Sequence, residues 1–351
     1  MEWKTSVLNR VDNKIIQLRK GTLRKWRSVK QTLRDPQSLN ELKLLQENFV
    51  IVPVDKASNN LSLICKKYYI KTIQKELNST TYRKAETLDT TINNQVTKCL
   101  DLGSTIHSDN RKLPIMYAIP KMHKNPVKFR FIVAANKCLS KDIAKTVTKI
   151  LKLFMAIHRK YCDKIKAYTR IERMWITEST KDILDDVHHL NIKKRSKSVN
   201  TFDFSTLYTK INLEDLKDKL DWITDKAFKG GTNQYIRILR DSAKFDNIDR
   251  QNGRYSGQVY TKDKCKEMIH FIIDNAYFSV ADQCYQQIIG IPMGTDPAPF
   301  IANLYLYYYE FVWMEHLTKT NYGIARKCYA HTRRFIGDLC TFNNDEHLLN
   351  N

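Results

Sequence analysis

The sequence lacks the cysteine patterns that hold metal ions or cross-link small folds. Its 351 residues include eight cysteines, but no C-x-x-C pair and no cluster of cysteine with histidine at zinc-binding spacing. These absences argue against a zinc site and against a disulfide scaffold. We therefore expect reduced, partly buried thiols in an intracellular protein.

Long hydrophobic runs are also missing. The N-terminus has no apolar core of a signal peptide, and no run reaches the ~18 apolar residues that a membrane span needs. The nearest candidate, Phe300 to Met314, is interrupted by Asn303 and Glu310 and predicts a buried helix. We expect no membrane partner.

Acidic side chains are few, because 37 Asp and Glu stand against 59 Lys and Arg, for a net charge of +22. Residues 1–34 hold ten basic and two acidic residues, and residues 111–152 hold eleven and one. Such an excess suits a polyanion such as nucleic acid, and the interleaved rings of Tyr117, Phe129 and Phe131 add stacking surface. Charge alone leaves two alternatives to nucleic-acid binding. The basic side chains could form a face that is merely solvated, or they could bind an anionic membrane surface.

The apolar periodicity predicts an α+β protein, and a hydrophobic content of 42% allows a sizeable core. Ser140, Asn212 and Asp296 are each expected to cap the start of a helix, with Pro297 as the first helical residue after Asp296. Residues 229–260 are polar and predict a loop insertion. Other expected elements are strands over 49–55, 61–65 and 129–134, a turn at 56–60, a hairpin over 277–289, and helices over 66–78, 88–101 and about 265–276.

The segment Thr201-Phe-Asp-Phe-Ser-Thr-Leu-Tyr208 points to chemistry on phosphates. Nucleotidyl transfer needs two divalent cations ~3.5–4 Å apart, held by carboxylates on adjacent strands. Asp203 ends an expected strand and is the first candidate ligand, with the backbone carbonyl of Phe204 as a second oxygen donor. A strand-end Asp that only makes a turn is the alternative.

Three further features each have a functional interpretation and a purely structural one. Tyr208 follows Asp203 by five residues, where its ring would exclude a 2′-hydroxyl, although such a Tyr is more often part of the core. Lys128 and Arg130 share one face of a strand and suit a triphosphate, or simply form a solvated basic face. Gly290 and Gly294 flank a turn that either approaches a ligand closely or is an ordinary turn.

Six motifs in this order resemble the reverse transcriptases of Penelope-like retroelements, which are relatives of telomerase. They cover roughly residues 49–342 and read Pro53-Val-Asp-Lys-Ala-Ser58, Ile119-Pro-Lys-Met-His-Lys124, Lys128-Phe-Arg-Phe-Ile132, Asp203-Phe-Ser-Thr-Leu-Tyr-Thr209, Ile291-Pro-Met-Gly-Thr295 through Ala302-Asn303 to Glu310, and Arg334-Phe-Ile-Gly-Asp338. The resemblance implies a right-hand polymerase fold with an antiparallel palm sheet backed by helices. The expected parts are a basic helical arm over 1–48, fingers over 49–199 and a palm over 200–351.

The same resemblance implies an RNA-directed DNA polymerase that takes an RNA template, a DNA primer and deoxynucleoside triphosphates, and that acts in the nucleus. Two Mg²⁺ ions, or Mn²⁺, would be bound by Asp203, Asp338 and the Phe204 carbonyl. The other implied roles are triphosphate contacts at Lys128 and Arg130, a sugar gate at Tyr208, a nucleotide-facing turn at Met293 and Gly294, and nucleic-acid contacts at Lys121, His123 and Lys124.

Two departures from the family pattern bear on activity. Gly337 stands where the family has the first Asp of an Asp-Asp hairpin, so a carboxylate that bridges the metals is missing. The sequence also stops soon after Asn343-Asn-Asp-Glu346, before the family's thumb and its C-terminal endonuclease, so we expect a truncated copy. The leading hypothesis is a reverse transcriptase core with impaired catalysis, and the alternative is a non-catalytic remnant that only binds nucleic acid.

Overall fold

The computed structural model describes residues 36–192, 198–204, 206–228, 234–247 and 258–342, together with Asn13 and Ile16. The chain divides into two compact units, residues 1–72 and 73–351, which are described separately. The expected basic arm over 1–48 lies outside the described residues as far as position 35, apart from Asn13 and Ile16. The rest of that arm is the helix α3 (Pro36–Asn48).

The first unit contains α3, an antiparallel hairpin and the start of a helix. Strand β1 (Phe49–Val54) pairs with β2 (Ala57–Cys65) from Phe49↔Cys65 to Val54↔Ala57. The predicted turn at 56–60 is therefore wrong. The chain reverses at Asp55 and Lys56, where Lys56 has φ 63°, and the polar residues that follow belong to β2. Helix α4 (Lys66–Leu77) begins directly after β2 and confirms the helix expected over 66–78.

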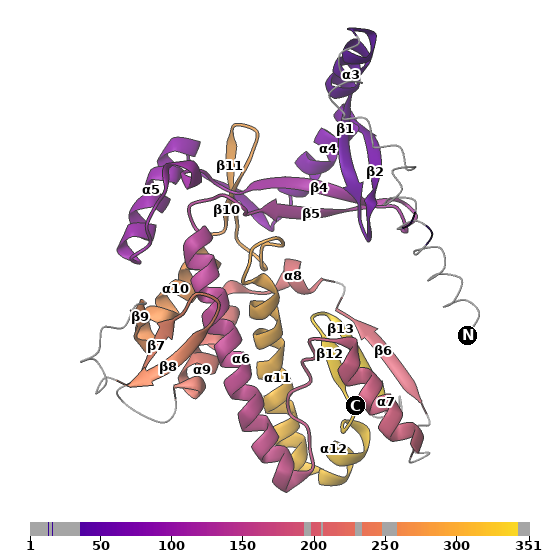
Figure 1. The fold of residues 1–351 in the computed structure, drawn as a ribbon, viewed down its shortest axis with the longest axis vertical. Helices are drawn as coiled ribbons and strands as arrows, with labels where there is room; N and C mark the ends of the chain where they lie inside the picture. The colour runs from indigo at the N-terminus through magenta and orange to yellow at the C-terminus, as the bar shows by residue number, and fades with distance from the viewer. Residues whose placement is uncertain are drawn as a thin grey trace. The chain divides into compact units, whose positions relative to one another are not determined.

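The second unit contains three sheets (Figure 1). The largest has the strand order β3-β11-β10-β4-β5, in which β10 and β4 run parallel and the other neighbours run antiparallel. The second has the order β12-β13-β6, and the third has the order β8-β7-β9. The strands are β3 (Tyr82–Lys84), β4 (Ile115–Lys121), β5 (Lys128–Ala134), β6 (Val199–Asp203), β7 (Gln234–Ile238), β8 (Ala243–Asn247), β9 (Val259–Tyr260), β10 (Tyr277–Val280), β11 (Gln283–Gln287), β12 (Arg333–Phe335) and β13 (Asp338–Phe342).

The helices of the second unit enclose its core, and in Figure 1 the two longest, α6 and α11, run alongside each other. Ser140 stands at the N-cap position of α6, as predicted, but its side chain makes no capping hydrogen bond. Asn212 caps α9 as predicted, because its side chain accepts hydrogen bonds from the amides of Glu214 and Asp215. The largest apolar cluster joins α5, α6, α9, α10 and α11. The helices are α5 (Leu88–Asp101), α6 (Lys141–Thr169), α7 (Thr180–Ile192), α8 (Leu207–Lys210), α9 (Leu213–Ala227), α10 (Lys262–Asp274), α11 (Ala298–Thr320) and α12 (Tyr322–Cys328).

Two further expectations from the sequence are corrected. Residues 229–260 are not simply a loop, because their described part forms β7, β8 and β9, with Ile236 fully buried. Helix α11 begins one residue later than expected, with Pro297 at the N-cap. Asp296 does not cap it, because its carboxylate pairs instead with the Lys141 ammonium at 2.8 Å.

Two expectations agree with the structure: the thiols are free and mostly buried, and the apolar run from Phe300 to Met314 is part of a buried helix. All eight cysteines are free, and six of them are buried. Helix α11, which contains Phe300 to Met314, buries ten of its side chains. Among the described residues, we find no helix long and apolar enough to cross a membrane.

Candidate functional site

Asp203 and Asp338 lie directly opposite each other on neighbouring antiparallel strands. Asp203 is the last residue of β6 and Asp338 the first of β13, and the strand register pairs the two Cα positions. Residues paired in this way have Cβ atoms about 4.5–5.5 Å apart on one face of the sheet, and like charges there destabilise the pair. Both residues are exposed. The register therefore brings the two predicted carboxylates together on one face of the sheet.

The turn between β12 and β13 places position 337 beside this pair. Ile336 and Gly337 form a two-residue turn in which Ile336 has φ 54°, an unfavourable conformation for a β-branched residue. The Gly337 carbonyl accepts a hydrogen bond from the Phe204 amide at 2.9 Å. A Cβ atom at position 337 would lie 3.7 Å from the Asp203 Oδ1 and 3.8 Å from the Phe204 carbonyl oxygen, which is ordinary contact distance. A side chain at position 337 would therefore fit next to Asp203.

The donor set suits a hard divalent cation. Asp203, Asp338 and the Phe204 carbonyl offer oxygen atoms, which Mg²⁺ and Mn²⁺ prefer. The Phe204 carbonyl already accepts a 3.2 Å hydrogen bond from the Leu207 amide, which leaves it one lone pair. Within the described ranges, no three His, Cys, Asp or Glu side chains are grouped to hold a metal ion. The set is therefore one carboxylate short of a cluster of three, and position 337 is the place where another would fit.

Arg334 supports the turn from within the core, a role that its sequence motif does not reveal. Its guanidinium is fully buried and pairs with the Glu310 carboxylate through Nε and Nη2. Nη1 donates to the Asn303 side chain at 2.9 Å and to the Ile336 carbonyl at 2.8 Å, and Nη2 donates to the Asn303 carbonyl at 3.1 Å. A buried charge with this many partners holds the strained residue of the turn against α11.

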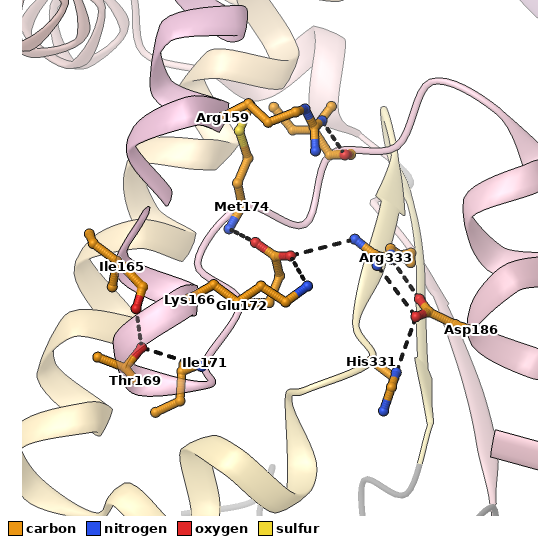
Figure 2. Close-up of polar contacts among 11 residues, drawn as sticks. Arg159, Ile165, Lys166, Thr169, Ile171, Glu172, Met174, Asp186, His331 and Arg333 are labelled. Carbon is orange, nitrogen blue, oxygen red and sulfur yellow. Dashed lines mark hydrogen bonds and ion pairs between the residues drawn. The ribbon is translucent and has the colours of Figure 1, made fainter. Parts of the chain in front are cut away.

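A second polar cluster connects β12 to α7 and to the segment after α6 (Figure 2). Asp186 of α7 accepts hydrogen bonds from the Arg333 Nε at 2.6 Å and from His331 at 3.1 Å. Glu172 binds the Lys166 ammonium at 3.0 Å and lies 3.8 Å from Arg333. Partial burial would raise the pKa of the Asp186 carboxyl, but the hydrogen bonds and positive charges of His331 and Arg333 outweigh it and lower the pKa to about 2.

The turn at 290–294 is bonded to two parts of the chain that carry predicted site residues. Gly290 and Gly294 have φ +81° and +107°. The Ile291 amide donates to the Tyr208 carbonyl at 2.9 Å, and the Met293 carbonyl accepts from the Val133 amide of β5 at 2.8 Å. A Cβ at Gly290 would lie 2.2 Å from the Tyr208 carbonyl oxygen, and one at Gly294 would lie 2.4 Å from the Val133 carbonyl oxygen. Only glycine allows this close approach on both sides.

The other predicted residues lie around this turn. The half-buried Tyr208 packs against the main core from α8, and burial raises the pKa of its phenol. Lys128, Arg130 and Ile132 alternate along β5, so their side chains lie on the same face of the strand. The Cγ2 of Ile132 would lie 3.0 Å from a Cβ atom at Gly294, so this face is the one that faces the 290–294 turn. Lys128 and Arg130 therefore project on the side of the turn. Lys121 pairs with Lys128 across the strands, and His123 and Lys124 are exposed in the β4–β5 connection.

The fold is similar to that of solved telomerases. Telomerase from Candida albicans in complex with the TWJ fragment of telomeric RNA matches with a TM-score of 0.56 and 16% identity, over 89% of this chain and 48% of that one. Telomerase from Candida tropicalis in complex with the TWJ fragment gives 0.57 and 12% identity, over 87% and 44%. Apo telomerase from Candida tropicalis truncated from its C-terminal domain gives 0.56 and 13% identity, over 87% and 54%.

These similarities define the fold. At 12–16% identity they show that the chain has a telomerase-like fold, and the chain spans about half the length of the structures it matches. No family model matches the sequence, and no curated protein matches it.

Proposed function

We propose that this chain is the polymerase core of a Penelope-like retroelement reverse transcriptase, with the fingers in residues 49–199 and the palm in residues 200–351. The observation that carries the proposal is the register of Asp203 with Asp338 at the end of a tight hairpin. The telomerase-like fold adds support, since telomerase structures were solved with RNA bound. The substrates would be an RNA template, a DNA primer and deoxynucleoside triphosphates. The protein would act in the nucleus.

The residues of the site have separate roles in this proposal. Asp203, Asp338 and the Phe204 carbonyl would hold divalent cations, either Mg²⁺ or Mn²⁺, which lower the pKa of the primer 3′-hydroxyl and offset the charge of the triphosphate. Lys128 and Arg130 would contact the triphosphate, because guanidinium binds phosphate through two hydrogen bonds.

The turn and the residues near it would fix the nucleotide and the nucleic acid. Met293 and Gly294 would face the base and sugar, and Tyr208 would exclude a 2′-hydroxyl. Lys121, His123 and Lys124 would contact the nucleic-acid backbone. The backbone bonds from the turn to Tyr208 and Val133 support this grouping, because they fix the turn relative to both the sugar gate and β5.

A second function, binding without synthesis, is favoured by Gly337. The two carboxylates that remain give a divalent cation fewer negative ligands than three would. Losing support around a metal site costs about 10–100-fold in affinity or activity, and losing a direct ligand should cost more. The unmodified chain would then hold nucleic acid without extending it.

Template-directed incorporation tests the proposal. A Gly337→Asp variant, fused to the thumb of a telomerase, is given an RNA template, a labelled DNA primer and one deoxynucleotide at a time. We expect extension only with the nucleotide complementary to the template. Hybrid binding without extension in this variant supports the second function, and the absence of both binding and extension contradicts both functions.

A further inference from the structure

A polar groove of about 510 Å³ lies between α5 and the strands β3, β10 and β11. None of its lining residues belongs to the candidate site. The lining includes three cations, Arg83, Lys84 and Lys98, and one carboxylate, Glu86. In Figure 1, α5 lies beside the β10–β11 hairpin, and both belong to the second unit.

The floor of the groove is a row of side chains across three strands. The register pairs Arg83 of β3 with Gln286 of β11, and Gln286 in turn with Tyr277 of β10. Paired residues lie on the same face of a sheet, so a guanidinium, an amide and a phenol stand side by side. Helix α5 adds Gln95 and Lys98 from above this row.

Two amides hold the cations of the groove in place. The Gln286 amide donates to the Asp274 carbonyl at 2.7 Å, and its oxygen accepts from the Arg83 Nη2 at 2.6 Å. The Asn275 amide donates to the Phe271 carbonyl at 3.0 Å, and its oxygen accepts from the Lys98 ammonium at 2.9 Å. Both amide groups are oriented by carbonyls of the last turn of α10, so their oxygens face the cations.

An amide fixes a cation without neutralising it. In the described part of the chain, neither Arg83 nor Lys98 has a carboxylate oxygen within 4.0 Å. The lysines of α9 and α10 differ, because Lys219 lies 3.0 Å from Asp215 and Lys266 lies 2.9 Å from Asp225. The groove therefore keeps positive charge, with its donors already oriented.

We propose that this groove binds the phosphodiester backbone of a single nucleic-acid strand. Its size is that of a pocket for a small ligand, so it can take part of one strand, and oriented cations suit phosphate oxygens. Amides and a phenol add hydrogen bonds to sugars and base edges and a ring for stacking. The inference rests on the proposed function, since it gives a polymerase core a second contact with the strand that it holds.

The test compares two double variants of the full chain that remove equal charge. Arg83→Gln/Lys98→Gln changes the groove, and Lys219→Gln/Lys266→Gln changes lysines that are paired with carboxylates. Binding of labelled 12-nucleotide RNA and DNA strands is measured by fluorescence anisotropy from 50 to 200 mM salt. The groove variant should bind about tenfold more weakly or worse, with a log–log salt slope shallower by about 1.4 for two lost phosphate contacts. The control should stay within about twofold of wild type, and the RNA and DNA arms show which strand the groove prefers.

Each other outcome has a defined meaning. If both variants lose the same affinity for the strand, or if the groove variant loses none, the proposal for the groove is overturned while the proposed function stands. If the wild type binds no strand, the proposed function fails as well, and binding of an acidic peptide in place of nucleic acid also overturns the groove. If the groove variant does not fold, photo-crosslinking of 4-thiouridine RNA to the wild type decides. A cross-link in the peptide that contains Tyr277 supports the groove, and cross-links only elsewhere reject it.

Discussion

At the scale of single residues, the turn beside the candidate site is supported by a fully buried side chain, Arg334. Arg334 is among the largest fully buried side chains in the structure, and it joins Glu310 and Asn303 of α11 to the carbonyl of Ile336. The sequence shows an arginine before an aromatic residue and gives no sign of its burial. Its partners lie 24 and 31 positions away, and only folding brings them together.

The first prediction concerns the Arg334–Glu310 pair. Arg334→Met should lower the free energy of unfolding by about 3–5 kcal/mol, because Glu310 is left as a buried charge without its partner. The double variant Arg334→Met/Glu310→Met should recover part of that loss. Urea denaturation measures both, and a loss below about 1 kcal/mol in the single variant would show that the buried pair is not a major support.

The second prediction concerns Asp186 and pH. The pKa of this carboxyl is lowered to about 2, so its ionised form stabilises the folded state above the unfolded pKa of about 3.9, and that contribution is lost as the pH falls towards 2. Asp186→Asn should cost about 1–2 kcal/mol at pH 6 and progressively less below pH 4. Urea denaturation of both proteins across this range measures the difference, and a constant difference would contradict the assignment.

At the scale of elements, the sequence predicted most helices and strands but not how they connect. Apolar periodicity and caps at Ser140 and Asn212 located α6 and α9 because both signals are local. The strands β7 and β8 escaped prediction because half of their ten residues are polar and, among their described side chains, Ile236 alone is fully buried. Their pairing depends on backbone hydrogen bonds, which composition does not report.

The third prediction separates steric contact from backbone strain at glycine. Gly294→Ala adds a Cβ 2.4 Å from the Val133 carbonyl oxygen at φ +107°, whereas Gly103→Ala adds one at φ +79° with no atom within 4 Å. Gly103→Ala should cost about 1–2 kcal/mol from backbone strain alone. Gly294→Ala should cost about 1–3 kcal/mol more, from overpacking. Thermal unfolding compares the two, and equal losses would indicate that the 290–294 turn does not pack closely against β5.

At the scale of the whole molecule, the site could be predicted only in part. The order of motifs predicted that Asp203 and Asp338 belong to one site, and the register of β6 with β13 brings them opposite each other. Tertiary packing creates the hydrogen bonds of the 290–294 turn to Tyr208 and Val133, and it also creates the groove beside α5. A local sequence pattern therefore cannot predict either feature.

The fourth prediction follows from the net charge of +22, of which residues 111–152 carry a large share. If six or more phosphates are contacted, affinity for an RNA–DNA hybrid should fall by about 10³-fold or more between 50 and 200 mM salt. Fluorescence anisotropy over this range measures the slope. A log–log slope near zero would show that phosphate contacts do not drive binding.

Primer extension at position 337 is the most direct test of the claim that Asp203, Asp338 and residue 337 form one catalytic site. The comparison uses thumb fusions of the unmodified chain, the Gly337→Asp variant, and Gly337→Asp with Asp203→Asn, all with Mg²⁺ and an RNA-templated DNA primer. We predict no measurable extension by the unmodified fusion, clear extension by Gly337→Asp, and loss of that extension when Asp203→Asn is added. Robust extension by the unmodified fusion, or extension by Gly337→Asp that survives Asp203→Asn, would contradict this account.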